Sequence, residues 1–523
     1  MRSAGSDRDL RMRPVTCAVL ALVALLALIP LTSKACATES VRISADAPGE
    51  PFPHFWEEAF GSGHAALAMR ADYLRDLRAV KRITNFRYVR FHGILDHGVG
   101  VYTRNYFGKP VYNFSNVDTI YDGLLRNGVM PFVELSFMPP AIAANPYDRY
   151  AFWYRPNVSP PQSYGRWAAV IKAFARHLIA RYGINEVASW YFEVWNEPNE
   201  TFRGGTWQQQ HTYFGLYDAT ARALKAVSPR LRVGGPATAH AAWIRAFLHH
   251  VATHHVPIDF VTTHAYADDS TRALLGSTRP VPYNDRLCLA VRRVRREIDQ
   301  SALAKLPLFI TEWSVMGEND ARDTTYVGPA VADVIRQCDG SVQMMSFWTF
   351  SDVFEEDGPN PGPFTGGFGL RAYGGINKPS YYAFELLHEL GHERLSNPSH
   401  SVIVTRTRQG ALVIALWNLV DPGLKGRPKS MRLEISGMPA DAPVAIQRVD
   451  HDHGDVLPVY RAMGSPRYPT PGQVAAMNAA TALPAPQIVH MHAGVLVLTL
   501  QPNALFLLRI PARRAPTSGT AGP

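Results

Sequence analysis

Short apolar runs and longer helical patterns alternate along most of this 523-residue chain, and this alternation constrains the fold more than any other feature. Eight runs have the length and the apolar or aromatic composition of buried strands. They lie around residue 56 and at 88–92, 130–135, 191–197, 232–235, 260–264, 308–313 and 344–350. Strict alternation indicates a parallel sheet, and eight units over about 340 residues predict an α/β fold of the (β/α)₈ barrel type.

Helical spacing of apolar residues predicts the helices between these strands. The expected helices span 72–83, 117–127, 164–182, 208–227, 241–254, 285–300, 327–338 and 381–390. A glycine-rich turn is expected at 61–64, directly after the aromatic run. The last helix completes the eighth unit, so we expect the barrel to occupy residues 38–395.

The pattern changes after residue 395. Six strand-like runs follow, separated by Gly, Pro and Asp, and they predict a small antiparallel β-sandwich over residues 396–512. These runs span 401–407, 411–417, 430–435, 444–449, 495–500 and 504–510. A strand-like stretch at about 41–49 precedes the barrel and is a candidate to pair with the sandwich. Residues 513–523 are rich in Ala, Pro, Gly and Ser and are expected to form a disordered tail.

Residues 1–37 have the pattern of a cleavable signal peptide. Four arginines precede an apolar stretch at 15–31, and Ala35-Cys36-Ala37 matches a cleavage signal. Lipidation of Cys36 is the alternative, although Lys34 occupies a position where small or apolar residues are expected. We therefore expect a periplasmic or secreted protein that has no stable membrane insertion after cleavage.

Composition and charge exclude several other classes of protein. Hydrophobic residues make up 46% and charged residues 19% of the chain, as in ordinary globular proteins. Cleavage after residue 37 removes five bases and two acids, so the formal net charge falls from +9 to +6. The densest basic cluster, at 292–296, fits a solvated helix face, and no nucleic-acid partner is expected. Cys288 and Cys338 remain after cleavage and fit either a disulfide or two buried thiols.

Two of the expected strands end in a glutamate. Asn196 and Glu197 precede Pro198, which cannot continue a strand and fixes a turn at that position. Glu312 ends the seventh strand-like run in the same way. Catalytic residues of (β/α)₈ enzymes lie at the carboxyl ends of the strands, so a closed barrel would bring both glutamates to one pocket.

Such a carboxylate pair fits hydrolysis of a glycosidic bond. One carboxylic acid protonates the leaving oxygen, and one carboxylate attacks the anomeric carbon when the two groups are about 5–5.5 Å apart. Apolar surroundings and a second carboxylate both raise a carboxyl pKa, which keeps the acid protonated near neutral pH. A lone strand-end glutamate also fits a structural role, but a pair in equivalent positions favours catalysis.

Several motifs resemble glycoside hydrolase family 39, within the clan of retaining (β/α)₈ glycosidases. The motifs are Trp195-Asn196-Glu197-Pro198-Asn199, Ile310-Thr311-Glu312-Trp313, Phe55-Trp56-Glu57-Glu58, Gly61-Ser62-Gly63-His64, Arg90-Phe91-His92-Gly93, Thr262-Thr263-His264-Ala265-Tyr266, the stretch 154–161 and the stretch 347–356. The resemblance extends from about residue 41 to about residue 510. It implies the barrel and sandwich fold and a site that needs no cofactor and no metal.

The resemblance also implies a role for individual residues. Glu197 would be the acid/base, Glu312 the nucleophile, and Asn196 would contact the 2-hydroxyl of the sugar. The residues expected to line the sugar subsite are His92, His264, Tyr266, Trp348, Glu355 and Glu356. The two histidines and Trp348 also fit purely structural positions in a barrel. The side chains of Glu355 and Glu356 are expected to diverge, and Glu134 is either a bystander or a pKa modulator.

The family's best-known members are β-xylosidases and α-L-iduronidases, and the motifs do not separate them. We expect an exo-acting, retaining β-xylosidase that acts on oligosaccharides. The alternatives are α-L-iduronidase or α-L-arabinopyranosidase specificity, cleavage inside a chain, or a non-catalytic carbohydrate-binding protein. An iduronidase needs a base for the substrate carboxylate, and Arg371 and Lys378 are the candidates. Oligomeric state does not follow from the sequence.

Overall fold

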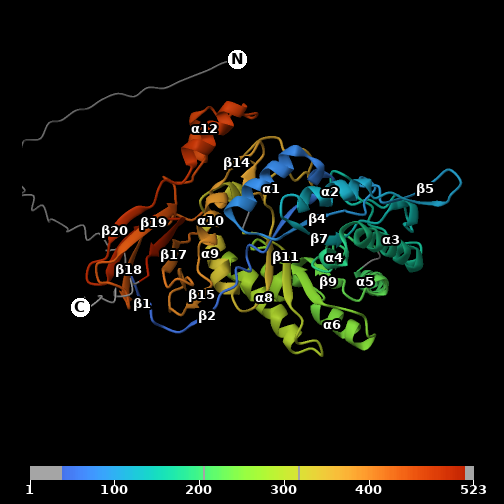
Figure 1. Ribbon diagram of the computed structural model, residues 1–523, viewed down its shortest axis with the longest axis horizontal. Helices are drawn as coiled ribbons and strands as arrows, with labels where there is room; N and C mark the ends of the chain where they lie inside the picture. The colour runs from blue at the N-terminus through green and yellow to red at the C-terminus, as the bar shows by residue number, and fades with distance from the viewer. Residues whose placement is uncertain (1–37, 204–205, 316–317, 513–523) are drawn as a thin grey trace, which may run out of the picture.

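The computed structural model describes residues 38–203, 206–315 and 318–512 (Figure 1). Eight parallel strands close into a barrel with the order β10-β11-β12-β3-β4-β7-β8-β9. These strands are β3 (Ala59–His64), β4 (Tyr88–His92), β7 (Met130–Leu135), β8 (Tyr191–Val194), β9 (Arg232–Thr238), β10 (Phe260–His264), β11 (Leu308–Trp313) and β12 (Met344–Phe347). The predicted (β/α)₈ barrel is therefore confirmed.

Helices surround the strands and follow the predicted periodic patterns closely. They are α1 (Ala71–Ile83), α2 (Ser115–Leu125), α3 (Tyr164–Tyr182), α4 (Ile184–Val187), α5 (Thr206–Val227), α6 (Ile244–Thr253), α7 (Thr271–Leu275), α8 (Tyr283–Asp299), α9 (Val327–Cys338) and α10 (Pro379–His388). In α8 the buried residues Leu287, Val291, Val294 and Ile298 recur at helical spacing and face the barrel.

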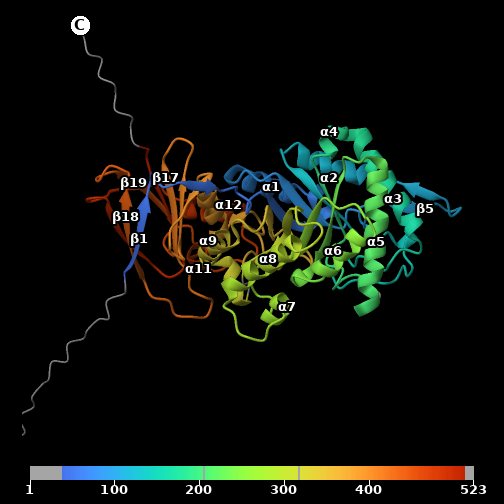
Figure 2. The same cartoon turned by 90° about the horizontal axis from the view of Figure 1, so that it is seen from below.

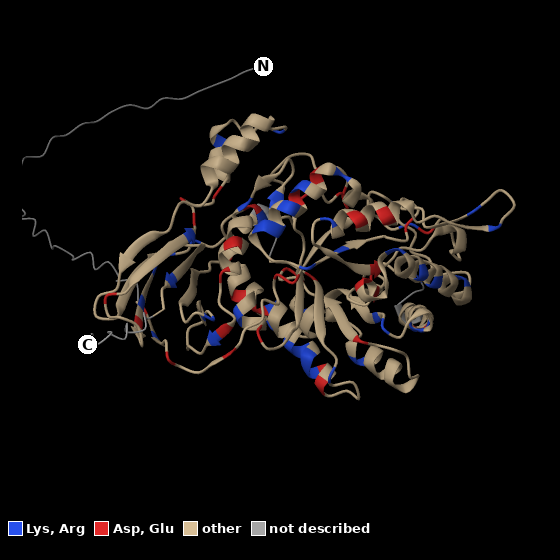
Figure 3. Cartoon of the chain, in the orientation of Figure 1, with Lys and Arg blue, Asp and Glu red and all other residues tan. Residues whose placement is uncertain are grey.

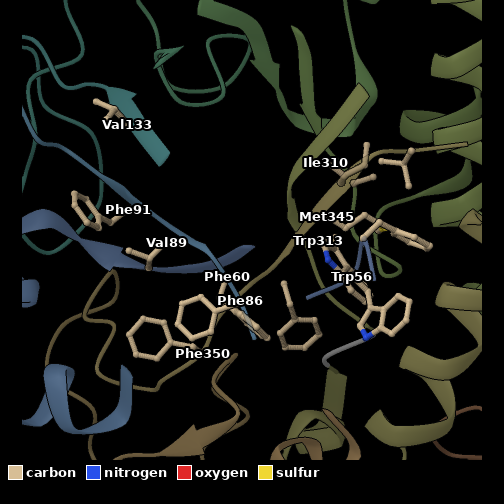
Figure 4. Packing of buried hydrophobic residues seen from close by; sticks show 14 of the residues in the cluster. Trp56, Phe60, Phe86, Val89, Phe91, Val133, Ile310, Trp313, Met345 and Phe350 are labelled. Carbon is tan, nitrogen blue, oxygen red and sulfur yellow. The ribbon is translucent and has the colours of Figure 1, made fainter. Parts of the chain in front are cut away.

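Alternation along the strands divides the side chains between the barrel interior and the helices. Inward-facing Tyr88, Phe132, Tyr191, Phe260 and Phe309 form a separate apolar cluster at the amino-terminal end of the barrel. The intervening residues contribute to the main core beneath the helices. Figure 4 shows part of that core, in which the rings of Phe60 and Phe86 lie 5.2 Å apart.

The sequence predicts a turn at residues 61–64, but these residues lie within β3, the first barrel strand. A Cβ atom on Gly61 would lie 2.0 Å from Cε3 of Trp348, and a Cβ atom on Gly63 would lie 2.2 Å from the carbonyl oxygen of Phe354. These glycines therefore permit close packing beside a strand. Glycine in a strand often marks such an approach, so the expected turn at 61–64 is wrong.

Two further sheets form a sandwich beside the barrel (Figure 2). A seven-stranded sheet has the order β2-β15-β16-β17-β22-β19-β20, and a three-stranded sheet has the order β1-β18-β21. Their strands are β1 (Glu39–Ser44), β2 (Gly49–Pro51), β15 (Glu393–Leu395), β16 (Val402–Arg406), β17 (Leu412–Asn418), β18 (Lys429–Ser436), β19 (Pro443–Val449), β20 (Gln487–His490), β21 (Val495–Leu500) and β22 (Ala504–Ile510). β1 pairs in parallel with β18, so the first described strand belongs to the sandwich.

One face of the seven-stranded sheet packs against the barrel. Ala415, Trp417, Leu505 and Leu507 belong to the same hydrophobic core as the barrel residues. The helix α9 is buried on nearly all sides, because the barrel and the sandwich cover opposite faces of it. The opposite face of the sheet packs against the three-stranded sheet and forms a second core.

A disulfide joins Cys288 in α8 to Cys338 in α9, with the Cα atoms 5.2 Å apart. This settles the alternative that the sequence left open. Arg292 and Arg293 of the basic cluster donate hydrogen bonds to the carbonyl oxygens of Gln337 and Ala241. Figure 3 shows both basic and acidic residues on the helices around the barrel.

The remaining elements lie in loops. They are the strands β5 (Tyr102–Arg104), β6 (Pro110–Tyr112), β13 (Arg371–Ala372) and β14 (Ile376–Asn377), the 3₁₀ turns η1 (Ala65–Met69), η2 (Pro140–Ile142), η3 (Ala239–Ala241) and η4 (Glu318–Asp323), and the helices α11 (Leu457–Ala462) and α12 (Pro471–Thr481). The sequence analysis did not predict α11 and α12. None of the helices in the described ranges combines the length and apolarity needed to cross a membrane. The expected signal peptide and tail lie outside the described residues.

Candidate active site

The two glutamates singled out in the sequence meet at the carboxyl end of the barrel. Glu197 follows β8, and Glu312 lies near the end of β11. Three atoms lie within 4.8 Å of one another, namely one carboxylate oxygen of each glutamate and a ring nitrogen of His264. The backbone N–H of Glu197 donates to the carbonyl of Ala237 in β9, which fixes the turn that presents the side chain.

Arg90 lies beneath this pair and holds several carboxylates together. Its Nη1 donates to Glu312 Oε1 at 2.6 Å, and its Nε donates to Glu193 Oε2 at 2.6 Å. Its Nη2 donates to the amide oxygen of Asn196 at 3.0 Å and also lies 2.8 Å from Glu134 Oε2. Burial works to lower the pKa of Arg90, but these carboxylates raise it on balance. A fully buried guanidinium thus fixes the base of the site in its charged form.

Burial raises the pKa of Glu197 to about 7. Its Oε1 lies 2.9 Å from Nδ1 of His264, and burial lowers the pKa of that imidazole to about 4. His264 is therefore neutral at neutral pH and adds no positive charge that would ionise the glutamate. Glu197 is thus placed to carry a proton near neutral pH, as a general acid requires.

Glu312 has a different set of partners. The phenol of Tyr266 donates to Glu312 Oε2 at 2.7 Å, and Arg90 donates to the other oxygen. The two glutamates are therefore close in space but chemically distinct.

His92 lies between two further carboxylates. Its Nδ1 lies 2.7 Å from Glu134 Oε2, and its Nε2 lies 3.1 Å from Glu356 Oε1. Burial alone would lower the pKa of His92, but Glu134 and Glu356 raise it well above its usual value. The ring also stacks on Phe152, with 5.9 Å between the ring centroids. His92 is thus a charged histidine that connects the strand ends to the loop containing Glu356.

A family model described as "Glycosyl hydrolases family 39" matches residues 39–490 of this chain. The chain belongs to glycosyl hydrolase family 39. As a member of this family, the chain is a glycoside hydrolase and acts on an oligosaccharide substrate. Family membership sets aside the alternative of a non-catalytic carbohydrate-binding protein.

Known members of family 39 cover almost the whole chain. A β-xylosidase of Geobacillus stearothermophilus is 36% identical over 489 residues, which cover 90% of this chain and 96% of that protein. A β-xylosidase of Caldicellulosiruptor saccharolyticus is 37% identical over 429 residues, which cover 79% of this chain and 86% of that protein. The crystal structure of a monomeric β-xylosidase from Caulobacter crescentus CB15 aligns with a TM-score of 0.80 and 33% identity, covering 91% of this chain and all of that one.

Most of the residues expected in the family 39 site lie together. The residues joined directly to Glu197, to Glu312 or to each other are His92, His264, Tyr266 and Glu356. Asn196 is connected to Glu312 through Arg90. Trp348 is nearly inaccessible to solvent and contacts His92, with ring centroids 4.9 Å apart. It also packs over Gly61, and its contact with the sugar stays a prediction.

Glu355 and its neighbour Glu356 diverge, as expected. Glu355 forms an ion pair with Arg70, whereas Glu356 faces His92. Both residues line a cavity of about 270 Å³ that is formed largely by the loop 352–368 together with Arg322.

Sequence reasoning missed Arg90 and Glu193 as members of the family 39 site and left Glu134 undecided. Each is a charged residue in an otherwise apolar strand, and Glu134 and Glu193 are direct register partners in β7 and β8. Arg90 lies two residues before His92 in β4, so both point into the barrel. This period of two was the signal that could have identified them.

Arg371 and Lys378, the candidate bases for a substrate carboxylate, have structural partners instead. Arg371 Nε lies 3.2 Å from Asp76 Oδ1. Lys378 is fully buried, and its Nζ lies 2.7 Å from both Asp323 and Asp352. Neither contacts the catalytic pair.

Proposed function

We propose that this family 39 enzyme is a β-xylosidase that releases xylose from xylo-oligosaccharides by double displacement with retention of configuration. The approach of Glu197 and Glu312 to within 4.8 Å is the observation on which the mechanism rests. A retaining glycosidase places its carboxyl groups about 5–5.5 Å apart, whereas an inverting enzyme needs about 6.5–9.5 Å to admit a water molecule.

Glu197 acts as the acid/base in this mechanism. Its carboxyl group, with a pKa of about 7, protonates the glycosidic oxygen while Glu312 attacks the anomeric carbon. The deprotonated Glu197 then accepts a proton from the water that hydrolyses the glycosyl-enzyme. Asn196, held by Arg90, contacts the 2-hydroxyl, and Tyr266 orients Glu312.

The charges around the site favour a neutral sugar over an iduronate. Arg90 and His92 already contact carboxylates, and Arg322 beside the cavity pairs with Asp268. Glu356 adds a further acidic group that faces the site, and a substrate carboxylate would meet it without a spare base. A neutral sugar, such as a pentose, avoids this conflict.

Exo action is part of this proposal. Cleavage inside a polysaccharide would require an extended groove instead.

The substrate is tested with aryl β-xyloside, α-L-arabinopyranoside, α-L-iduronide and β-glucoside. We expect the parent enzyme to turn over the β-xyloside fastest. Glu200→Ala is the matched control, because Glu200 is exposed and lies three residues after Glu197; this variant should retain the parent rate. A faster reaction with the iduronide or arabinoside would contradict the proposed substrate but not the proposed mechanism.

The catalytic roles are tested with Glu312→Ala and Glu197→Ala. Loss of the nucleophile should lower kcat by roughly 10⁴-fold or more, and loss of the acid/base by roughly 10²–10⁴-fold. Added azide should give β-xylosyl azide with Glu197→Ala, because azide attacks the glycosyl-enzyme, and α-xylosyl azide with Glu312→Ala. The opposite pattern of products would reverse the assigned roles.

We also propose export of the enzyme to the periplasm or medium, with cleavage after residue 37. The disulfide between Cys288 and Cys338 supports this, because disulfides persist in oxidising compartments. Mass spectrometry of the protein from a periplasmic fraction should give an amino terminus at Thr38. Recovery of the intact chain from the cytoplasm alone would contradict the proposal.

A further inference from the structure

A second cluster of histidines and a carboxylate lies outside the active site. The donor atoms of His54, Glu57 and His388 lie within 4.8 Å of one another. Nδ1 of His54 is 2.8 Å from Glu57 Oε1, and Nδ1 of His388 is 2.8 Å from the same oxygen and 3.1 Å from Oε2. Two imidazole nitrogens therefore converge on a single carboxylate.

The cluster joins the start of the barrel to its end. His54 and Glu57 precede β3, the first barrel strand, and His388 is the last residue of α10. The cluster thus lies at the amino-terminal end of the strands, opposite the catalytic pair. His54 stacks on Trp56, with ring centroids 4.4 Å apart, and this contact restricts the orientation of its imidazole.

The donor set and its geometry match a metal site. Two imidazole nitrogens and one carboxylate oxygen form one of the ligand sets of Zn²⁺, whose bonds of about 2.0–2.2 Å hold neighbouring ligand atoms roughly 2.9–3.4 Å apart. The observed nitrogen–oxygen distances of 2.8–3.1 Å need little adjustment to reach this range. His388 has 38% of its side chain exposed, which leaves a path for the ion and for water as further ligands.

We propose that His54, Glu57 and His388 bind a divalent cation of the Zn²⁺ type. The nitrogen ligands favour Zn²⁺, Co²⁺ or Ni²⁺ over Mg²⁺ and Ca²⁺, which prefer oxygen. Glu57 is buried and supplies a negative charge that offsets part of the charge of the ion. The ion crosslinks the segment before β3 to the end of α10 and is structural, because the catalytic pair lies at the other end of the barrel.

Two other clusters in the described residues offer three such ligands, and both include Glu312. The experiment must therefore separate the proposed site from the active site. Untagged protein is stripped with EDTA and titrated with ZnCl₂ by calorimetry. We expect one tight site per chain in the parent and in Glu312→Gln, and a rise in Tm that EDTA reverses.

Glu57→Gln and His388→Ala should each weaken Zn²⁺ binding by at least roughly tenfold and abolish the rise in Tm. His388→Ala changes a partly exposed side chain, so it tests the proposal if Glu57→Gln does not fold. The matched control is His250→Ala, because His250 also pairs with a carboxylate, that of Asp218, outside the proposed site; this variant should bind as the parent does.

Cobalt provides an independent measurement. Co²⁺ bound to the parent should show visible absorption bands that are absent in Glu57→Gln. The EDTA-treated parent should keep its glycosidase activity at low temperature. Failure of the parent to bind Zn²⁺, unchanged affinity in both site variants, or binding lost only in Glu312→Gln would each overturn the proposal.

Discussion

Glu197 and Glu312 have different surroundings, although one carboxylate oxygen of each lies within 4.8 Å of the other. Glu312 accepts hydrogen bonds from Arg90 and from Tyr266. Glu197 has only the neutral His264 as a recorded side-chain hydrogen-bond partner among the described residues, and burial raises its pKa to about 7. The proposed roles of acid and nucleophile thus correspond to different neighbours of the two groups.

The pKa of Glu197 predicts the alkaline limit of activity. The general acid must be protonated, so kcat/KM should fall about tenfold per pH unit above pH 7. Measurement of kcat/KM from pH 4 to pH 10 checks this. With an activated aryl xyloside, the fall in kcat/KM above pH 7 should be absent in Glu197→Ala and present in Glu200→Ala. If the fall in kcat/KM above pH 7 persists in Glu197→Ala, the titration of another group causes it.

Tyr266 should contribute to catalysis through Glu312. Tyr266→Phe removes a hydrogen bond to a charged group, worth about 1.5–3 kcal/mol, so kcat should fall roughly 10- to 150-fold. Steady-state kinetics and thermal unfolding of the variant check this. Tyr147→Phe is the control, because Tyr147 is exposed and should be neutral. Unchanged kcat in Tyr266→Phe would exclude the positioning role.

At the scale of elements, a buried charge cluster fixes the loop beside the active site. Lys378, next to α10, contacts Asp323 of η4 and Asp352 of the loop after β12, and donates to the carbonyl of Gly367. Burial raises the pKa of Asp352 to about 6 even with this lysine beside it. The lysine therefore neutralises carboxylates that burial would otherwise make unfavourable.

Lys378→Ala should destabilise the fold by about 3–5 kcal/mol at pH 8, because two buried carboxylates lose their cation. The decrease in the free energy of unfolding should become smaller as the pH falls below about 6, because Asp352 then gains a proton in the folded state. Urea unfolding at pH 8 and at pH 5 checks the sign. Arg126→Ala, at an exposed ion pair with Asp122, should cost less than about 0.5 kcal/mol at either pH. Equal destabilisation at both pH values would contradict this account.

The sequence predicted helices and strands wherever the buried apolar residues recur at regular spacing. The helices α3 and α9 match their predicted ranges, because each repeats apolar residues along its full length. The helix α12 was missed, because it buries only Met477 and Thr481. Its amino terminus did carry a signal, a capping box between Thr470 and Gln473 with proline at the first turn.

The candidate site was predictable only in part. Glu197 and Glu312 follow directly from strand ends, whereas the roles of Arg90 and Glu134 depend on which strands become neighbours in the closed barrel. The separation of Glu355 from Glu356 depends on a loop whose backbone no local pattern specifies. Long-range pairing, rather than local propensity, is therefore what the sequence failed to reveal.

At the scale of the whole molecule, the barrel and the sandwich share one hydrophobic core. Leu505 of β22 is fully buried, and a Cβ atom on Gly328 of α9 would lie 3.4 Å from its Cβ. Because α9 is covered on both sides, neither unit buries its apolar surface without the other. The two units should therefore unfold together.

Leu505→Ala tests this coupling. Removal of a buried leucine side chain costs about 2–5 kcal/mol, and the cost should appear in a single transition that lowers the Tm of both units. Calorimetry and residual glycosidase activity after heating should shift together. Val497→Ala, on the outer sheet with 55% of the side chain exposed, should leave both unchanged. Since Leu505 lies in the sandwich, early unfolding of that unit with activity retained would show that the barrel is stable without it.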